Sequence, residues 1–350
     1  MAAPRAAAAP ILRRACCTHM NKRCPTAATA VSRRFSPARV PRRTHTTSSA
    51  SSASSASSSS PSSSSSSVSP DEVAHFNALA STWWDPYGPS RLLHQMNPLR
   101  HDFIRTCVQQ DDASPSPSPS PSSSSVSSVT DARQLPRHYL DVGCGGGIFA
   151  ESAARLPTTM SVTAIDPSAA VLAVARAHAQ RDPVLQQRLQ YRQAAIEDLS
   201  NSSSSSDAAA TARYDVVTLF EVLEHVATDP ATFLAQCGRL VRPGGWLVLS
   251  TMARTWASWL TTVLVAEDVL GIVPRGTHDW RKYVNADELR AYFAPGAPAA
   301  AATTWQRATF QGVMYVPGLG WQVVPGGEQL GNYFFGIQKA PEEKEEEDGP

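Results

Sequence analysis

Two carboxylates and one imidazole lie within five consecutive residues, from Glu221 to His225. Glu221 and Glu224 are three positions apart, so on a helix they would share one face, with His225 beside them. Two oxygen donors and one nitrogen can hold a divalent cation such as Mg²⁺, although the nitrogen also suits Zn²⁺ or Mn²⁺. His225 could instead act as a general base, or Glu224 and His225 could only cap and orient a helix.

A run of glycines is the second group with chemical potential. Asp141 ends an apolar segment and is followed by four glycines within five positions, 143–147, and then by a helix-forming segment. Glycine allows a sharp turn and leaves no Cβ between the backbone and a ligand. A second apolar segment ends in Asp166, where a carboxylate can accept hydrogen bonds from both hydroxyls of a ribose. This pattern indicates a nucleotide-like or amino-acid-like ligand, and a plain strand-to-helix turn is the structural alternative.

A sheet whose strands alternate with helices must position both groups. Helices are expected at 150–156 and 169–180. The expected strands, of which the last two should be antiparallel, are 139–142, 161–166, 189–192, 214–220, one within 240–250, 312–316 and 333–338. Ligands bind beyond the carboxyl ends of the strands in an open parallel sheet. Glu221, directly after the fourth strand, should therefore border the glycine run.

The folded part of the chain is expected to begin near residue 69. Ser69 or Asp71 can cap a helix that has a proline in its first turn. Trp83 and Trp84 follow, and for either one core packing is as good an explanation as a ligand contact. Arg100 is expected to open a helix over 101–108, from which its guanidinium could bind a carboxylate of the ligand in a bidentate manner.

The Asp-x-Gly-x-Gly-x-Gly spacing and the acidic end of the next strand resemble the class I S-adenosylmethionine-dependent methyltransferases. The resemblance implies an α/β, Rossmann-like fold: a seven-stranded mixed sheet with helices on both faces. It implies S-adenosylmethionine as the methyl donor. The residues expected to bind this donor are Arg100, Asp141, Gly143, Gly145, Gly147, Asp166 and Phe220. Glu197 and Asp198 stand where such enzymes often contact adenine.

A narrower resemblance rests on two N-terminal stretches, Phe76-x-x-Leu79-Ala80-x-x-Trp83-Trp84-Asp85 and Leu93-His94-x-x-Asn97-Pro98-Leu99-Arg100. They are similar to the signature of the ubiquinone-biosynthesis O-methyltransferases, which methylate phenolic hydroxyls of polyprenyl dihydroxybenzoate-type rings and demethylubiquinol. The resemblance assigns Glu221, Glu224 and His225 to Mg²⁺ and to catalysis. A methyltransferase for a soluble phenol or a ring carbon, and a non-catalytic cofactor-binding scaffold, are the alternatives.

The chemistry explains why such residues are needed. Methyl transfer from a sulfonium to oxygen requires a phenolate, whereas a phenol with a pKa of ~10 keeps its proton at neutral pH. A metal that acidifies the phenol, or a base such as His225, can supply this phenolate.

The charge distribution predicts the organisation of the rest of the chain. The first 70 residues hold ten Lys and Arg and no Asp or Glu, which is typical of a mitochondrial transit peptide, and a disordered basic arm is the alternative. We expect a transit peptide at 1–47, a Ser-rich linker at 48–69, the methyltransferase domain at 70–340 with a disordered insert at 113–128, and an acidic tail at 341–350. The acidic remainder of the chain argues against nucleic-acid binding.

Membrane contact is expected to be peripheral, because no apolar run reaches the ~18 residues of a membrane span. Residues 252–274 are rich in Trp and aliphatic side chains. A lid, an interfacial helix or core packing would each explain this composition. The resemblance further implies attachment to the matrix side of the mitochondrial inner membrane and assembly with other ubiquinone-biosynthesis proteins.

Overall fold

The computed structural model describes residues 66–112, 137–202, 214–255, 258, 280–297 and 304–341, all within the compact unit Ser62–Pro350. Several expectations lie outside these ranges: the transit peptide, most of the serine-rich linker, the insert at 113–128, most of the Trp-rich segment and most of the acidic tail. In the described ranges, no helix is both long enough and apolar enough to cross a membrane.

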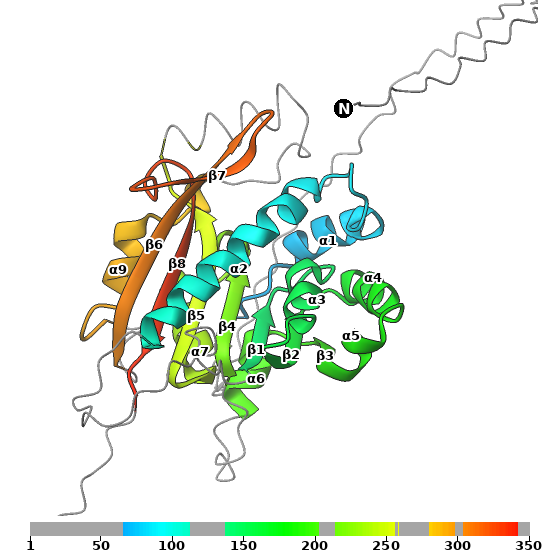
Figure 1. Ribbon diagram of the computed structural model, residues 1–350, viewed down its shortest axis with the longest axis horizontal. Coiled ribbons are helices and arrows are strands. Elements are labelled where there is room, and N and C mark those ends of the chain that lie inside the picture. The colour runs from blue at the N-terminus through cyan, green and yellow to red at the C-terminus, as the bar shows by residue number, and fades with distance from the viewer. Residues whose placement is uncertain are drawn as a thin grey trace, which may run out of the picture. The chain divides into compact units, whose positions relative to one another are not determined.

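A single mixed sheet forms the centre of the described structure, in the order β3-β2-β1-β4-β5-β8-β6-β7 (Figure 1). The strands are β1 Arg137–Val142, β2 Thr159–Asp166, β3 Leu189–Gln193, β4 Tyr214–Phe220, β5 Val241–Met252, β6 Trp305–Val316, β7 Gly320–Val324 and β8 Asn332–Lys339. Strands β1 to β5 pair in parallel, whereas β8 pairs antiparallel with β5 and β6. The expected strands and their directions are therefore confirmed.

The described sheet has eight strands, one more than the seven expected. The additional strand, β7, pairs only with β6, to which it is joined by a tight turn at residues 317–319. Gly318 and Gly320 adopt positive φ angles of 85° and 75° at this turn, a conformation that glycine reaches without strain. The sequence prediction took 312–316 as one strand and missed the hairpin, because β7 has no buried residue and therefore no alternation of buried and exposed positions.

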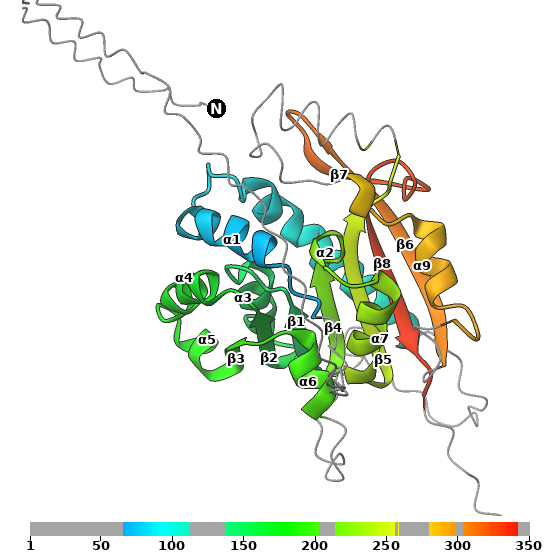
Figure 2. The same cartoon turned by 180° about the vertical axis from the view of Figure 1, so that it is seen from behind.

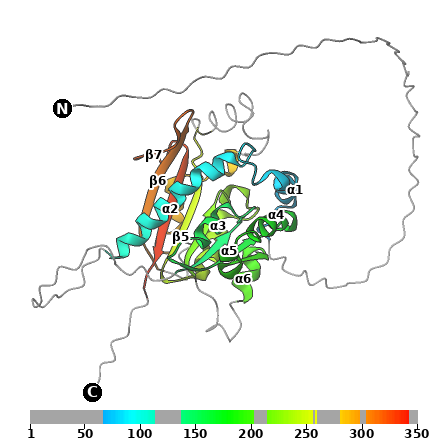
Figure 3. The ribbon, with the colours of Figure 1, turned by 45° about the vertical axis from the view of Figure 1, so that its right-hand side comes forward.

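Helices cover both faces of the sheet, as expected. Their bounds are α1 Pro70–Leu79, η1 Ala80–Thr82, α2 Arg91–Asp112, α3 Ile148–Ala154, α4 Ala169–Ala179, α5 Pro183–Arg188, α6 Ile196–Ser202, η3 Leu223–His225, α7 Pro230–Leu240, η5 Trp280–Lys282 and α9 Ala286–Tyr292. Figure 1 shows α2 and α3 in front of the sheet, and Figure 2 shows α6, α7 and α9 on the opposite side. Figure 3 shows α2 running obliquely across the β5–β8–β6 part of the sheet.

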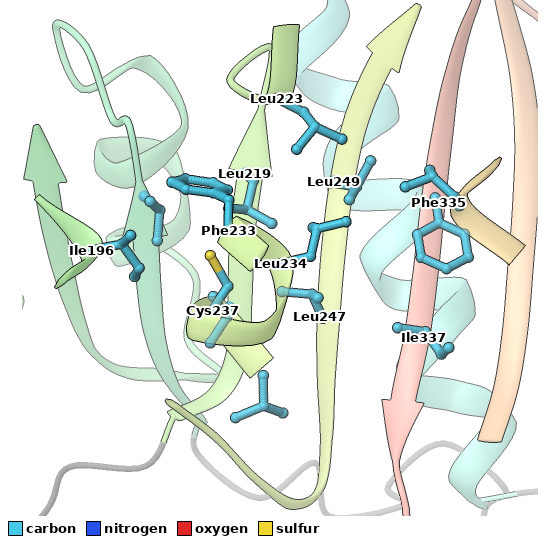
Figure 4. Close-up of a cluster of buried hydrophobic side chains, with 14 of the residues drawn as sticks. Ile196, Leu219, Leu223, Phe233, Leu234, Cys237, Leu247, Leu249, Phe335 and Ile337 are labelled. Carbon is cyan, nitrogen blue, oxygen red and sulfur yellow. The ribbon is translucent and has the colours of Figure 1, made fainter. Parts of the chain in front are cut away.

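Each face has its own buried hydrophobic cluster. The cluster beneath α2 to α5 includes Phe103, Phe149, Leu172, Leu185 and Trp246. The cluster beneath α6, α7 and α9 includes Ile196, Phe233, Leu234, Leu289 and Phe335, and part of it is drawn in Figure 4. The central strand β4 is buried along its whole length because both of its faces are covered.

Arg100 does not open a helix, which corrects the sequence prediction. It lies in the middle of α2, which begins at Arg91 and continues through Pro98. Proline removes one backbone donor and disfavours a helix interior. The helix nevertheless continues because Met96, Phe103 and Cys107 are buried along one side of it, on both sides of the proline. Tertiary packing thus overrides the local signal.

Replacing this proline should stabilise the protein. Pro98 is exposed, so Pro98→Ala gives the His94 carbonyl a helical N–H to accept from and removes no buried surface. We expect the free energy of unfolding to rise by about 1–3 kcal/mol in urea denaturation. Gln95→Ala, at an exposed position of the same helix, is the control and should change it by less than about 0.5 kcal/mol. A less stable Pro98→Ala protein would show that α2 needs the proline.

Candidate active site

The glycine loop follows β1 and turns the chain into α3. Gly143, Gly145 and Gly147 have φ angles of 66°, 53° and 88°, in the left-handed region that side chains disfavour. The amide of Cys144 donates to the carbonyl of Ile165 on β2, at 3.0 Å, which fixes the loop at the carboxyl edge of the sheet. The alternation of left-handed residues explains the spacing of three of the glycines.

Protein side chains occupy the space that a Cβ would take on this loop. A Cβ on Gly145 or Gly146 would lie 2.3 or 2.2 Å from the indole ring of Trp83. A Cβ on Gly143 would meet Val222, and a Cβ on Gly147 would meet the hydroxyl of Tyr191. The loop therefore needs glycine for its own packing as well as for the approach of a ligand. Trp83 is both buried and a lining residue of the cavity beside the loop.

Asp166 lies at the end of β2, where the sequence placed it. One carboxylate oxygen accepts a hydrogen bond from the amide of Gly145 at 3.0 Å, and the other accepts from the amide of Ser168 at 2.8 Å. Burial raises the pKa of Asp166, and these two hydrogen bonds act in the opposite direction. A carboxylate has about four acceptor positions, and these two hydrogen bonds use one on each oxygen. Asp166 can therefore still accept hydrogen bonds from a ligand's hydroxyls.

Asp141 and Arg100 are buried behind the cavity and do not line it. The hydroxyl of Thr218 donates to Asp141 at 2.8 Å, and burial raises the pKa of Asp141 to about 7. The guanidinium of Arg100 lies over the ring of Phe220, 4.8 Å from its centroid. Its Nε has no hydrogen-bond partner among the described residues, which leaves a buried donor available to an anionic group.

The cavity at the carboxyl edge of the sheet has a volume of about 590 Å³. It brings together seven of the residues proposed from the sequence: Gly143, Gly145, Asp166, Phe220, Glu221, Glu224 and His225. The glycine loop after β1, the acid at the end of β2 and the segment after β4 therefore meet in one space. Of the other three proposed residues, Gly147 begins α3, while Asp141 and Arg100 support the cavity from behind.

Glu221, Glu224 and His225 do not share a helix face, so the sequence prediction that they would do so is wrong. Glu221 has a φ of 57°, and only Leu223–His225 form one turn of 3-10 helix. The end of β4 is held by β5, because the Glu221 amide donates to the Ser250 carbonyl at 3.2 Å and the Ser250 hydroxyl donates to the Glu221 carboxylate at 2.6 Å. A left-handed residue other than glycine is strained, and such strain is common at functional sites.

Glu224 is almost completely buried. The hydroxyl of Thr251 donates to one of its carboxylate oxygens at 3.0 Å. Burial, and after it the negative charge of Glu221, raises the pKa of Glu224 to about 7. The carboxyl group therefore gains and loses its proton near neutral pH.

His225 is held by a residue from the far N-terminal end of the fold. Its Nδ1 lies 3.0 Å from a carboxylate oxygen of Glu72, and the other oxygen accepts a hydrogen bond from Lys282 Nζ at 2.9 Å. The hydrogen bonds with His225 and Lys282 lower the pKa of Glu72 to about 2. Burial alone would lower the pKa of His225, but the hydrogen bond with Glu72 and the charges of Glu224, Glu72 and Glu221 raise it.

No three His, Cys, Asp or Glu side chains converge on one metal position in the part of the chain that the structure describes. Ser250, Thr251 and Glu72 each engage one atom of Glu221, Glu224 and His225, respectively. The Glu224 carboxyl also accepts a hydrogen bond from its own backbone N–H. Nδ1 is the His225 ring nitrogen that Glu72 engages, which leaves Nε2 as the second donor atom of the ring. Two oxygens and one nitrogen around one cavity suit a divalent cation by donor type, although they are not yet gathered around a single point.

Glu197 has a different role from the adenine contact suggested by its position in the sequence. Its two carboxylate oxygens accept hydrogen bonds from the amide and the hydroxyl of Ser67, at 2.8 and 3.1 Å. Asp198 caps its own turn by accepting a hydrogen bond from the Ala195 amide at 2.9 Å. Ala195 and Ile196 line the cavity, whereas Glu197 and Asp198 do not. Glu197 thus anchors the segment that leads into α1.

Sequence reasoning missed Glu72, Lys282, Ser250 and Thr251. Glu72 lies in the first turn of α1, and 153 positions separate it from His225. No local pattern reveals a contact over such a distance. Ser250 and Thr251 had a usable signal, since polar residues at the carboxyl end of a buried parallel strand face the ligand edge of the sheet.

Comparison with known proteins shows which families the chain resembles. A family model described as a methyltransferase domain matches residues 121–294. The "Ubiquinone biosynthesis O-methyltransferase, mitochondrial" of Candida albicans is 40% identical over 77% of this chain and 85% of its own length. The "Ubiquinone biosynthesis O-methyltransferase" of Alkalilimnicola ehrlichii is 40% identical over 62% of this chain and 74% of its own.

Solved structures are more distant. The magnesium protoporphyrin IX methyltransferase of Synechocystis is 14% identical over 77% of this chain and 100% of that chain, with a TM-score of 0.45. Similarity at this level supports no statement about function.

The contact between Trp83 and the glycine loop can be measured with a double-mutant cycle. Gly145→Ala should destabilise the protein by about 2–4 kcal/mol, because alanine is strained at this φ and its Cβ meets the indole. In a Trp83→Leu background the same change should cost about 1–2 kcal/mol less. Denaturant unfolding gives both values.

Gly244→Ala provides the matched control for this cycle. Gly244 has a φ of 74°, but nothing lies within 4 Å of the position of its Cβ. Its substitution should cost about 1 kcal/mol in either background. Equal costs of Gly145→Ala with and without Trp83 would contradict the proposed packing.

The raised pKa of Glu224 predicts a pH-dependent loss of stability. The carboxyl ionises at about 4.5 in the unfolded chain and at about 7 in the fold, so stability should fall as pH rises through this interval. Glu224→Gln keeps an acceptor for Thr251 and has no proton to lose. With a chelator present, the variant should gain roughly 2–3 kcal/mol over the wild type between pH 5 and pH 8. Asp102→Asn, at an exposed carboxylate, should show no such gain.

Proposed function

The chain belongs to the ubiquinone biosynthesis O-methyltransferase family, and from this membership we propose the reaction and the residues that carry it out. The enzyme is an S-adenosylmethionine-dependent O-methyltransferase. Its acceptor is a phenolic hydroxyl of a polyprenyl dihydroxybenzoate-type ring or of demethylubiquinol. The observation that supports this proposal most is one cavity lined by the glycine loop, Asp166 and the Glu221–His225 segment.

The residues around the glycine loop suit the methyl donor. Gly143 and Gly145 line the cavity, and Asp166 offers acceptor positions to ribose hydroxyls. The free Nε of Arg100 suits the carboxylate of the methionyl group once that group reaches behind Phe220. When bound, S-adenosylmethionine supplies a methyl group on a sulfonium, and S-adenosylhomocysteine is the second product.

The acid and histidine segment suits the acceptor. The phenol must lose its proton before its oxygen can attack the methyl carbon. Glu72 accepts from Nδ1 of His225, which leaves Nε2 for one of two roles. It accepts the phenol's proton when no cation is bound to it, or it binds the cation that acidifies the phenol. Glu72 thus orients the imidazole and stabilises its protonated form.

We also propose that Mg²⁺ binds the free donor atoms of Glu221, Glu224 and His225. A cation would relieve the repulsion between the two carboxylates, which contributes to the raised pKa of Glu224. Binding requires the three side chains to converge from their present positions beside Ser250, Thr251 and Glu72. When bound, the ion supplies Lewis acidity that lowers the pKa of a coordinated phenol.

An assay with labelled S-adenosylmethionine and a prenylated catechol tests the function and the metal together. Chelation should remove most turnover, and added Mg²⁺ should restore it. Glu221→Gln, Glu224→Gln and His225→Asn should each lose most turnover, and combining them should cost little more, because the three act as one unit. Calorimetric titration of Mg²⁺ gives a reading independent of turnover, and each substitution should weaken the ion's binding.

Two results would contradict the metal proposal. They are full activity after chelation and a Glu221→Gln enzyme close to wild type. Loss of activity in His225→Asn alone would leave His225 as a general base acting without an ion. His138→Asn, at an exposed histidine on β1, is the control and should retain wild-type activity.

We further propose that residues 1–47 direct the protein to mitochondria, where it lies on the matrix side of the inner membrane with other enzymes of the pathway. The basic, acid-free composition of the first 70 residues and the mitochondrial relatives support this location. A reporter fused to residues 1–60 should enter mitochondria, and a version with its arginines changed to glutamine should not. The full protein should sediment with inner membranes and be released by alkaline carbonate, together with partner enzymes. A cytosolic reporter would contradict the targeting proposal.

A further inference from the structure

The cavity has a second half that the donor and the acid segment do not use. This half extends from the Glu221 end toward the start of α2 and the β6–β7 hairpin. Its walls include Leu92, Leu93, Met96, Val313, Tyr315 and Trp321. None of these six side chains is acidic or basic, in contrast to the half that holds Asp166, Glu221, Glu224 and His225.

The hairpin wall is built from one face of two paired strands. Val313 pairs with Val323 and Tyr315 pairs with Trp321, so these four side chains project from the same face of β6 and β7. The rings of Tyr315 and Trp321 are in edge contact, with centroids 5.6 Å apart. The wall is thus formed by aromatic and branched side chains in fixed register.

A hydrogen bond joins the hairpin to the opposite wall of the cavity. Trp321 Nε1 donates to the carbonyl of Leu92, in the first turn of α2, at 3.0 Å. This bond satisfies the indole N–H and leaves the apolar ring to line the cavity. The distance between the two walls is therefore set by the fold, and the apolar half is formed before any ligand enters.

The polar groups in the neighbouring half determine which part of the acceptor can occupy the apolar half. An acceptor hydroxyl must reach Glu221 and His225 beside the donor, where the lining is charged. The hydrocarbon substituent on the same ring is excluded from that polar half by the cost of leaving its charged groups without solvent or partner. The apolar half is continuous with the reaction position, because the walls of both belong to one cavity.

We propose that the isoprenoid tail of the acceptor lies between the first turns of α2 and the Val313–Tyr315–Trp321 face of the hairpin. This inference rests on the proposed function. The hairpin wall then selects prenylated acceptors over acceptors without a tail. The tail would then leave at the hairpin end. Leu319 at the turn is 72% exposed and Val323 is 45% exposed, so an apolar surface continues outward from the wall.

Acceptors with no tail and with one, two and more isoprene units test this inference on the full chain. The KM should fall at least tenfold with each of the first two units, because each unit moves several apolar CH₂-sized groups out of water and against the wall. It should then become constant once the added units pass the wall. A KM that does not depend on tail length would overturn the inference while leaving the methyltransferase function intact.

A charged side chain in the wall tests the position of the tail. Tyr315→Glu should raise the KM for the two-unit acceptor at least tenfold more than the KM for the tail-free acceptor. Leu93→Gln, on the opposite wall, should shift the same ratio in the same direction by a smaller factor. Calorimetric affinity for S-adenosylhomocysteine and the melting temperature establish that each variant is folded. An equal rise of both KM values in folded variants would overturn the inference.

Val184→Glu is the matched control. Val184 is a partly exposed apolar residue, 42% accessible, on α5 and away from the cavity lining. Its substitution should leave the KM ratio at the wild-type value. Failure of the wild-type enzyme to methylate any acceptor would overturn both the proposed function and this inference, so the two failures are distinguishable.

Discussion

The contact between Trp83 and the glycine loop is the interaction on which the site depends. The indole lies where the Cβ atoms of residues 145 and 146 would be, and the amide of Gly145 donates to Asp166. One loop therefore joins an N-terminal tryptophan, the end of β1 and the acid at the end of β2. The neighbouring Trp84 adds a hydrogen bond from its indole N–H to the Gly146 carbonyl at 2.9 Å. Movement of this N-terminal segment would alter the surface offered to the donor.

The N-terminal segment is attached to the rest of the fold largely through site residues. Helix α1 has no buried residue of its own, yet Glu72 binds His225 and Lys282, and Ser67 binds Glu197. The Asn77 side chain accepts a hydrogen bond from Ser168, which follows Asp166. Because His225 and Ser168 line the cavity, a ligand that orders them should also stabilise α1. Glu72, in the first turn of α1, thus completes the acceptor side of the site.

Much of the fold could be predicted from the sequence because its signals are local. A few consecutive residues are enough to predict the strands β1, β2 and β4 from their apolar runs. The same holds for the glycine turn and for Asp166 at the end of β2. Three features could not be predicted in this way. Packing carries α2 through Pro98, and hydrogen bonds with Ser250 hold Glu221 in a left-handed conformation. Glu72 contacts His225 across 153 positions. Each depends on partners that no short stretch of sequence contains.

The central claim is that the methyl donor binds on the glycine loop against Asp166, and calorimetric titration of S-adenosylmethionine tests it most directly. Asp166→Ala removes the acceptors for ribose hydroxyls and for the Gly145 amide. A loss of about 1–3 kcal/mol corresponds to roughly 5- to 150-fold weaker binding in the folded variant. Asp287→Ala, at an exposed carboxylate, should bind as the wild type does. Unchanged affinity in Asp166→Ala would contradict the assignment of the donor site.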